Sequence, residues 1–121
     1  MNANTERRPN VVLEKSFAFA LEVVALYQRL TEQREYVLAK QLLRSGTSIG
    51  ANVEEAQAGQ SHADFTAKMS VALKEARESR YWLRLLHQSQ LVQLDFMPAL
   101  ANAEEVVRIL TAIVKSAQSR S

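Results

Sequence analysis

The stretch "DFTAKMSVALKEARESRYWLRLL", residues 64–86, decides the fold class because its apolar and small side chains follow a heptad pattern. Spacings of four and three alternate through Phe65, Met69, Ala72, Ala76, Ser79, Leu83 and Leu86. This period is typical of helices that pack against one another at shallow angles. It predicts a helix over about 62–89, which Ser61 would cap with Asp64 three positions later.

Three further segments have the apolar spacing of helices, and no alternating strand pattern competes with them. Asp95 is placed to cap the last helix, and Pro98 lies in its first turn, where a missing N–H does no harm. We expect residues 1–10 to form a disordered leader and residues 11–118 to form one domain. The sequence therefore predicts an all-α fold, an antiparallel up-down-up-down four-helix bundle. Its other helices are predicted over about 11–31, 34–58 and 95–117.

The composition of the chain excludes several classes of protein. Its 121 residues suit a single core, and the absence of Cys excludes disulfides and thiolate metal sites. No apolar run is long enough for a membrane span, and the N-terminus lacks an apolar signal segment. We therefore expect a cytoplasmic protein with no membrane partner. Motifs of nucleophilic, phosphate-loop and zinc-protease chemistry are also missing. We expect no enzyme activity, no catalytic residue and no cofactor.

The first predicted helix carries more apolar surface than one core contact needs. One stripe consists of Phe17, Leu21, Val24 and Tyr27, and a second consists of Phe19, Val23, Leu26 and Leu30. An apolar arc of this width is typical of a helix that is buried on several sides. Alternatively, one stripe packs on the core and the other contacts a second subunit, which would make the protein a homo-oligomer.

The stretch "LLRSGTSIGANVEEA", residues 42–56, places poor helix formers and polar groups in a helix. Gly46 and Gly50 each cost about 1 kcal/mol relative to alanine, and an unpaired buried polar group costs about 1–3 kcal/mol. One interpretation is that small residues let the second and third helices approach closely, and that a structural polar network at this contact fixes register and subunit pairing. A second interpretation is a surface that faces a ligand or nucleic acid. The candidate members of the network are Ser45, Ser48, Asn52, Glu55, Glu75 and Glu78.

A third interpretation of the same glutamates is a carboxylate metal site like those of di-iron four-helix bundles. Such sites combine glutamates from two helices with a Glu-x-x-His motif on each of the other two. The chain has two histidines, His62 and His87, and the residues three positions before them are Gly59 and Arg84. Neither histidine completes the motif, so no metal ligand is predicted.

Basic residues on the second and third helices are candidates for contacts with phosphate groups. The arginines on the third helix have no acidic residue three or four positions away. If both sets share one side of the bundle, they make a phosphate-binding patch. Tyr81 and Trp82 lie between them and could stack on bases. Alternatively, Trp82 belongs to the core and the arginines are solvated or paired with glutamates of other helices. The candidates are Lys40, Arg44, Arg77, Arg80 and Arg84.

Four segments together resemble the four-helix bundle proteins known as 23S rRNA intervening-sequence proteins. They are "QLLRSGTSIGANVEEA" (41–56), the heptad stretch 64–86, "KSFAFALEVVALYQRL" (15–30) and "FMPALANAEEVVRILTAIVKS" (96–116). The similarity spans about 13–116. Its most specific patterns are S-I-x-A-N-x-x-E-A, which starts at Ser48, and K-E-A-x-E-x-x-Y-W-L, which starts at Lys74. Many relatives have proline where this chain has Gly50, a departure that concerns only the local helix geometry.

The resemblance implies a left-handed antiparallel bundle that assembles as a homopentamer in bacteria. It also implies kinship with the accessory protein of diversity-generating retroelements, a basic pentameric barrel thought to bind nucleic acid. The family has no established enzymatic activity. The leading hypothesis is therefore a non-catalytic, oligomeric protein that associates with RNA or DNA. The alternative is an oligomeric scaffold that binds a protein partner through helix faces, without nucleic acid. The family's motif positions, whose roles are not established, are Ser48, Asn52, Glu55, Lys74, Glu75 and Glu78.

Overall fold

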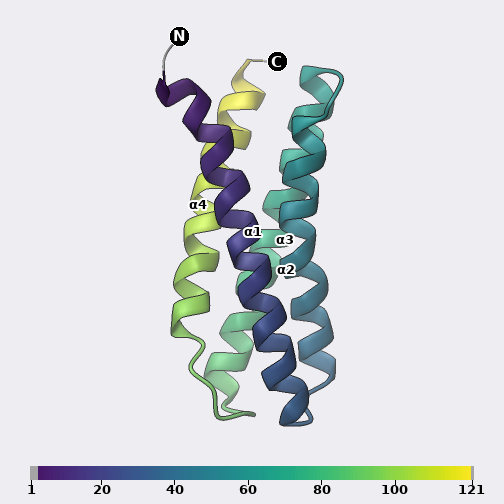
Figure 1. The fold of residues 1–121 in the computed structure, drawn as a ribbon, viewed down its shortest axis with the longest axis vertical. Coiled ribbons are helices and arrows are strands. Elements are labelled where there is room, and N and C mark those ends of the chain that lie inside the picture. Colours follow the sequence, from purple (N-terminus) through teal and green to yellow (C-terminus); the bar gives the residue numbers. More distant parts are fainter. Residues whose placement is uncertain (1–2, 121) are drawn as a thin grey trace.

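The chain folds into long α-helices joined by short connections. The computed structural model describes residues 3–120, with side chains from residue 11 onward. Each helix runs opposite to the one before it, and α1 begins at the same end of the bundle at which α4 ends (Figure 1). The predicted all-α, antiparallel up-down-up-down bundle is confirmed. The helices are α1 (Ala3–Glu32), α2 (Val37–Gln57), α3 (His62–Ser89) and α4 (Met97–Ser119).

The four helices pack in a ring in which each one contacts its two neighbours. The α2–α3 contact is the most extensive, and the α1–α4 contact is the least extensive. The heptad stripe of α3 faces the centre of this ring, because all of its members are buried except Phe65, which is half-buried. Phe19 of α1 and Phe96 at the start of α4 are the largest fully buried side chains. The heptad positions in residues 64–86 thus face the core, as the sequence predicts.

Helix α1 begins earlier than the sequence predicts. It starts at Ala3, inside the segment 1–10 that we assign to a disordered leader. Residues 1 and 2 of that segment lie outside the described residues. With 30 residues, α1 is longer than each of the other three helices.

Helix α2 begins at Val37, three residues later than the predicted position 34. Arg34 adopts a left-handed backbone conformation with a φ of 64°, which a helix cannot contain. The Glu35 carboxylate then accepts the N–H of Leu38 at 3.1 Å and satisfies a free donor of the first turn. The start of α2 is therefore set by this turn, which the apolar spacing does not reveal.

Side-chain oxygens also mark the starts of α3 and α4. Ser61 accepts the N–H of Asp64 at 3.0 Å, so the predicted cap of α3 is confirmed. Asp95 accepts the N–H of Met97 at 3.0 Å, but Phe96 occupies the N-cap position and its side chain makes no capping hydrogen bond, so the predicted cap at Asp95 is wrong. Helix α4 begins at Met97, two residues after the predicted start. Pro98 lies in the first turn of α4, as the sequence predicts.

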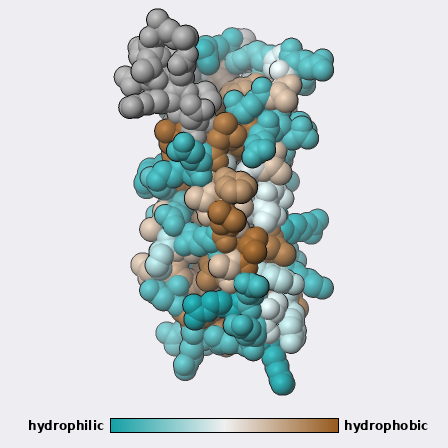
Figure 2. Space-filling view, viewed as in Figure 1, coloured by the Kyte–Doolittle hydropathy of each residue, from teal (hydrophilic) through white to brown (hydrophobic). Residues whose placement is uncertain are grey.

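The two apolar stripes of α1 have different surroundings. Phe19 and Val23 of one stripe are buried in the core. In the other stripe, Phe17 is 56% exposed, Leu21 is 59% exposed and Val24 is 43% exposed. Figure 2 shows apolar side chains running over α1 on the front face of the bundle. We call Phe17, Leu21 and Val24 the α1 apolar stripe, which lies outside the core of the single chain.

The two glycines of α2 lie against α1. A Cβ atom added to Gly46 would come within 2.7 Å of a methyl carbon of Val23. A Cβ atom added to Gly50 would lie 3.5 Å from the carbonyl oxygen of Ser16, which is an ordinary contact. The sequence predicts small residues at a close contact between α2 and α3. The structure corrects this for the glycines, because they form the close approach between α1 and α2.

Each end of the bundle has a hydrogen bond between segments that are distant in the sequence. At one end, Gln33 Nε2 donates to the carbonyl oxygen of Gln93 at 3.3 Å, and the N–H of Gln93 donates to Gln33 Oε1 at 3.1 Å. This reciprocal pair joins the α1–α2 and α3–α4 connections. At the other end, His62 Nε2 lies 2.8 Å from the carbonyl oxygen of Ala117 and joins the start of α3 to the last turns of α4.

Candidate nucleic-acid interface

The three predicted arginines of α3 lie on its flank toward α4. Glu75 marks the opposite flank, because its carboxylate interacts with Arg44 of α2. Arg80 follows Glu75 by five positions, which turns it by about 140° around the helix axis, away from α2. Arg77 and Arg84 are exposed, and Arg80 is half-buried. Along the described part of the chain, none of the three forms an ion pair.

The two predicted cations of α2 lie beside the flank of α3 that carries Glu75, opposite the flank that carries the three arginines. Lys40 and Arg44 are both exposed. The charge of Arg44 is partly compensated, because its guanidinium lowers the pKa of the Glu75 carboxyl. The five predicted cations therefore do not form one patch in a single chain. Lys40 and Arg44 stay predictions as separate phosphate contacts.

Two cations of α4 that are not among the predicted site residues lie beside the arginines of α3. Asn102 and Glu105 mark the flank of α4 that faces α1, since both contact side chains of that helix. Arg108 and Lys115 lie seven positions apart on the other flank, toward α3. At 1.5 Å per residue, Arg77 and Arg108 both lie about 17 Å from the α3–α4 connection. The spacing is visible in the sequence, but only the ring order shows which helix these residues face.

These cations together form a charged surface along the α3–α4 contact. Within residues 11–120, no ion pair compensates any of them. Glu104 is an acidic residue of the same flank, so five positive charges share this surface with one carboxylate. We name the set the α3–α4 basic strip, and its members are Arg77, Arg80, Arg84, Arg108 and Lys115.

The two aromatic residues within the arginine run differ in burial. Trp82 is half-buried and packs against the core, which agrees with the alternative that it is a core residue. Its Nε1–H group is buried and has no hydrogen-bond partner among the described residues. Tyr81 is 51% exposed and meets the ring of Trp82 edge-on, with centroids 5.2 Å apart and an angle of 72° between planes. Of the two rings, Tyr81 is therefore the one that faces solvent.

The predicted polar network is replaced by short local hydrogen bonds. Ser79 donates to Ser45 at 2.8 Å in the buried α2–α3 contact. Asn52 Nδ2 instead donates to the carbonyl oxygen of Ser48 in its own helix, at 2.8 Å, and Glu55 is exposed. A side-chain amide or hydroxyl on a helix readily reaches the carbonyl four residues earlier. In the described α2–α3 contact, Ser79–Ser45 is thus the hydrogen bond that joins side chains of the two helices.

The two glutamates of α3 in the predicted network interact with each other. Burial raises the pKa of the Glu75 carboxyl above its ordinary value, and the neighbouring charge of Glu78 raises it further. Lys74 and Arg44 act in the opposite direction and lower this pKa. The cluster is a partly buried acid between two cations, on the flank of α3 that faces α2.

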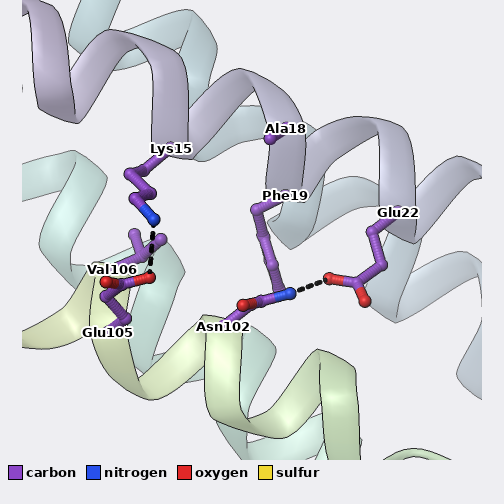
Figure 3. A pocket seen from close by; sticks show the side chains of 7 residues that line it. All are labelled: Lys15, Ala18, Phe19, Glu22, Asn102, Glu105 and Val106. Atoms are coloured by element: carbon purple, nitrogen blue, oxygen red, sulfur yellow. Dashed lines mark hydrogen bonds and ion pairs between the residues drawn. The ribbon is translucent and has the colours of Figure 1, made fainter.

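A hollow of about 180 Å³ lies in the α1–α4 contact. Figure 3 shows two interactions across it, and each joins a side chain of α1 to one of α4. Lys15 Nζ lies 3.2 Å from Glu105 Oε1, and Asn102 Nδ2 donates to Glu22 Oε1 at 2.9 Å. Phe19 and Val106 provide its apolar lining. The polar groups around the hollow are paired with one another. We therefore interpret the hollow as a packing gap in the α1–α4 contact, which is the least extensive of the helix contacts.

Neither a metal cluster nor a membrane span is found in the part of the chain that the structure describes. No three His, Asp or Glu side chains come together there in a group that could hold a metal ion. None of the described helices combines the length and the apolar character that crossing a bilayer requires.

Comparison with known proteins identifies the family. A family model described as 23S rRNA-intervening sequence protein matches residues 8–112. The chain belongs to this family. A similar crystal structure is that of a protein of unknown function from the S23 ribosomal protein family of Bacteroides thetaiotaomicron VPI-5482. It is 45% identical, the match covers 89% of this chain and 98% of the other, and the TM-score is 0.84. No curated protein matches the chain.

Membership of the 23S rRNA-intervening sequence family confirms the resemblance found in the sequence. The kinship with the accessory protein of diversity-generating retroelements stays a prediction. The family and the similar structure leave the biochemical role open, since the Bacteroides protein is itself described as having unknown function.

The Glu75 cluster of this 23S rRNA-intervening sequence family member predicts a pH-dependent stability. A carboxyl whose pKa is raised on folding binds its proton more tightly in the folded state. The free energy of unfolding then falls as the pH rises above the ordinary pKa of 4.5. We expect Glu75→Gln to stabilise the protein at pH 7 by less than about 1 kcal/mol, and the gain to vanish below that ordinary pKa. Urea unfolding of the wild type and the variant, at pH 7 and at a pH below 4.5, would measure the difference in stability.

Glu54→Gln, at an exposed position of α2, is the control for removing one negative charge. It should leave the dependence on pH as it is in the wild type. A loss of stability in Glu75→Gln at pH 7 would mean that attraction to Lys74 and Arg44 outweighs burial, and the prediction would be wrong.

Proposed function

We propose that this protein is a non-catalytic, oligomeric protein that associates with RNA or DNA in the bacterial cytoplasm. The observation that carries the proposal is the α3–α4 basic strip, whose five cations form no ion pair in the described chain. Unpaired cations along one surface attract a phosphate backbone and release its counterions. The family description names 23S rRNA, which makes structured RNA the first ligand to test. Lys40 and Arg44 are proposed as further phosphate contacts.

The oligomer is part of the same proposal. The α1 apolar stripe leaves three large side chains in water, at the spacing of four and three that a packed helix pair uses. A stripe of this kind suits contact with a second copy of the chain, and we propose the homopentamer that the family resemblance implies. Repeating a weak basic surface several times raises the overall affinity for one nucleic acid without any new contact.

Neutralising the arginines of α3 tests the association with nucleic acid. We expect the triple variant Arg77→Gln, Arg80→Gln, Arg84→Gln to bind structured RNA at least about tenfold more weakly at low salt, because three phosphate contacts are lost. The slope of log affinity against log salt should also become shallower, by about 2–3. A filter-binding titration over a range of salt concentrations measures both quantities.

The matched control removes three exposed arginines from other parts of the bundle, as Arg29→Gln, Arg34→Gln, Arg120→Gln. It has the same net charge as the first variant and should retain most of the affinity. If both triple variants lost the same affinity for RNA, the net charge of the protein would explain the binding and the arginines of α3 would have no specific role. An absence of RNA and DNA binding at low salt in the wild type would leave the alternative, an oligomeric scaffold for a protein partner.

A further inference from the structure

The exposed aromatic ring within the arginine run points to a more specific ligand. We propose that Tyr81, flanked by Arg77 and Arg84, is a stacking platform for an unpaired base, so that the ligand of α3 is single-stranded nucleic acid. This inference rests on the proposed function. It adds a class of ligand, since the basic strip alone would serve a duplex equally well.

Helical spacing puts these three side chains on one exposed stripe. Tyr81 follows Arg77 by four positions and precedes Arg84 by three, so all three point outward from the same side of α3. Arg80 lies beside them, three positions after Arg77 and four before Arg84. Like charges at such spacings destabilise a helix by about 0.2–0.5 kcal/mol per pair. The repulsion among Arg77, Arg80 and Arg84 is thus unfavourable for folding, and binding a polyanion would offset it.

The ring of Tyr81 is held in place by its neighbour. Trp82 packs against the core and contacts Tyr81 edge-on at 5.2 Å. This contact restricts the rotation of Tyr81 without stacking over it, and half of the tyrosine surface stays open. A ring fixed in this way loses little side-chain freedom when a base stacks on it. Stacking on an aromatic ring is available to every base, because each base has a π-face.

The distance between the arginines fits a strand that crosses the platform. Arg84 lies seven positions after Arg77 along the helix, a rise of about 10.5 Å. Their long side chains can therefore reach the phosphates on either side of one stacked nucleotide. In a duplex the faces of the bases are covered by their neighbours, so Tyr81 would find only the backbone. A single strand offers both the base face and the flanking phosphates.

The test compares Tyr81→Ala with Tyr81→Phe, which keeps the ring, and with Tyr36→Ala. Tyr36 is a matched control because it is 54% exposed and lies just before α2, outside the arginine run. The probes are a fluorescein-labelled, unstructured pyrimidine-rich RNA strand and a labelled RNA duplex of equal length. Anisotropy at low salt gives the affinity. Quenching of Trp82, the single tryptophan of the chain, reports stacking on the ring that touches it.

We expect Tyr81→Ala to weaken single-strand binding about tenfold and to abolish the quenching of Trp82. Tyr81→Phe and Tyr36→Ala should stay within about twofold of the wild type, and duplex binding should be unaffected by Tyr81→Ala. Equal single-strand affinity in Tyr81→Ala and Tyr36→Ala overturns the stacking platform and leaves the proposed function standing. The stacking platform is also overturned if Tyr81→Ala weakens duplex binding as much as single-strand binding, or if it changes the oligomer mass. No binding of either probe overturns both proposals.

Discussion

Replacing Gly46 with leucine is expected to lower the free energy of unfolding by about 3 kcal/mol. A Cβ atom at this position would lie 2.7 Å and 2.8 Å from the two methyl carbons of Val23. Val23 is fully buried and β-branched, so it has no free rotamer into which it can withdraw. The larger side chain would force α1 and α2 apart. Chemical unfolding followed by circular dichroism measures this loss, at equal protein concentrations because the protein is proposed to be oligomeric.

Gly50 provides the control, because it lies one turn further along the same helix. A Cβ atom at Gly50 would meet Ser16 at an ordinary distance of 3.5 Å. Gly50→Ala should therefore stabilise the protein by about 1 kcal/mol, the usual gain of alanine over glycine in a helix. The two substitutions have opposite expected signs. If Gly46→Leu were as stable as the wild type, or if Gly50→Ala were destabilised, the account of the α1–α2 contact would be wrong.

Replacing Leu21 with glutamate is expected to convert the proposed oligomer into a monomer of 13.6 kDa. Leu21 lies at the centre of the α1 apolar stripe, between Phe17 and Val24. Burying such side chains against a second copy would contribute about 1.5–3 kcal/mol each. A charge at the same place would have to leave water without a partner, which costs more than the leucine contributes. Multi-angle light scattering at micromolar concentration reports the mass directly, and a wild-type pentamer would show five times the mass of the chain.

The control for this variant is Leu91→Glu. Leu91 is 61% exposed, close to the 59% of Leu21, and it lies in the α3–α4 connection, outside α1. This variant should keep the mass of the wild type. If both variants dissociated, the α1 apolar stripe would not be the specific site of the subunit contact. A wild-type mass of 13.6 kDa would contradict the oligomer itself.

The fold could be predicted in detail because its signals are local. The heptads of residues 64–86 fix both the helix and the side of it that faces the core, and Ser61 caps it as expected. The start of α2 could not be predicted in the same way. It depends on the left-handed conformation of Arg34, for which the residue type gives no signal, since such a conformation is unusual for any residue other than glycine.

The candidate site was less predictable because it depends on the order of helices around the ring. Spacing placed Arg77 and Arg84 on one face, but it could not say that this face turns away from Lys40 and Arg44. Arg108 could not be predicted for the same reason, because it lies near the arginines of α3 only when α4 packs beside α3. Polar side chains gave a second difficulty. A helix offers Asn52 a partner in its own preceding turn, so a polar residue near a helix contact does not imply a bond across it.

The reciprocal bonds between Gln33 and Gln93 have a consequence for engineering the chain. They fasten two of the three connections to each other, so lengthening either one would pull its backbone out of register with the other. The remaining connection, residues 58–61, makes backbone hydrogen bonds only to nearby residues. An epitope or a guest domain is therefore best inserted there, where the helices on both sides keep their packing.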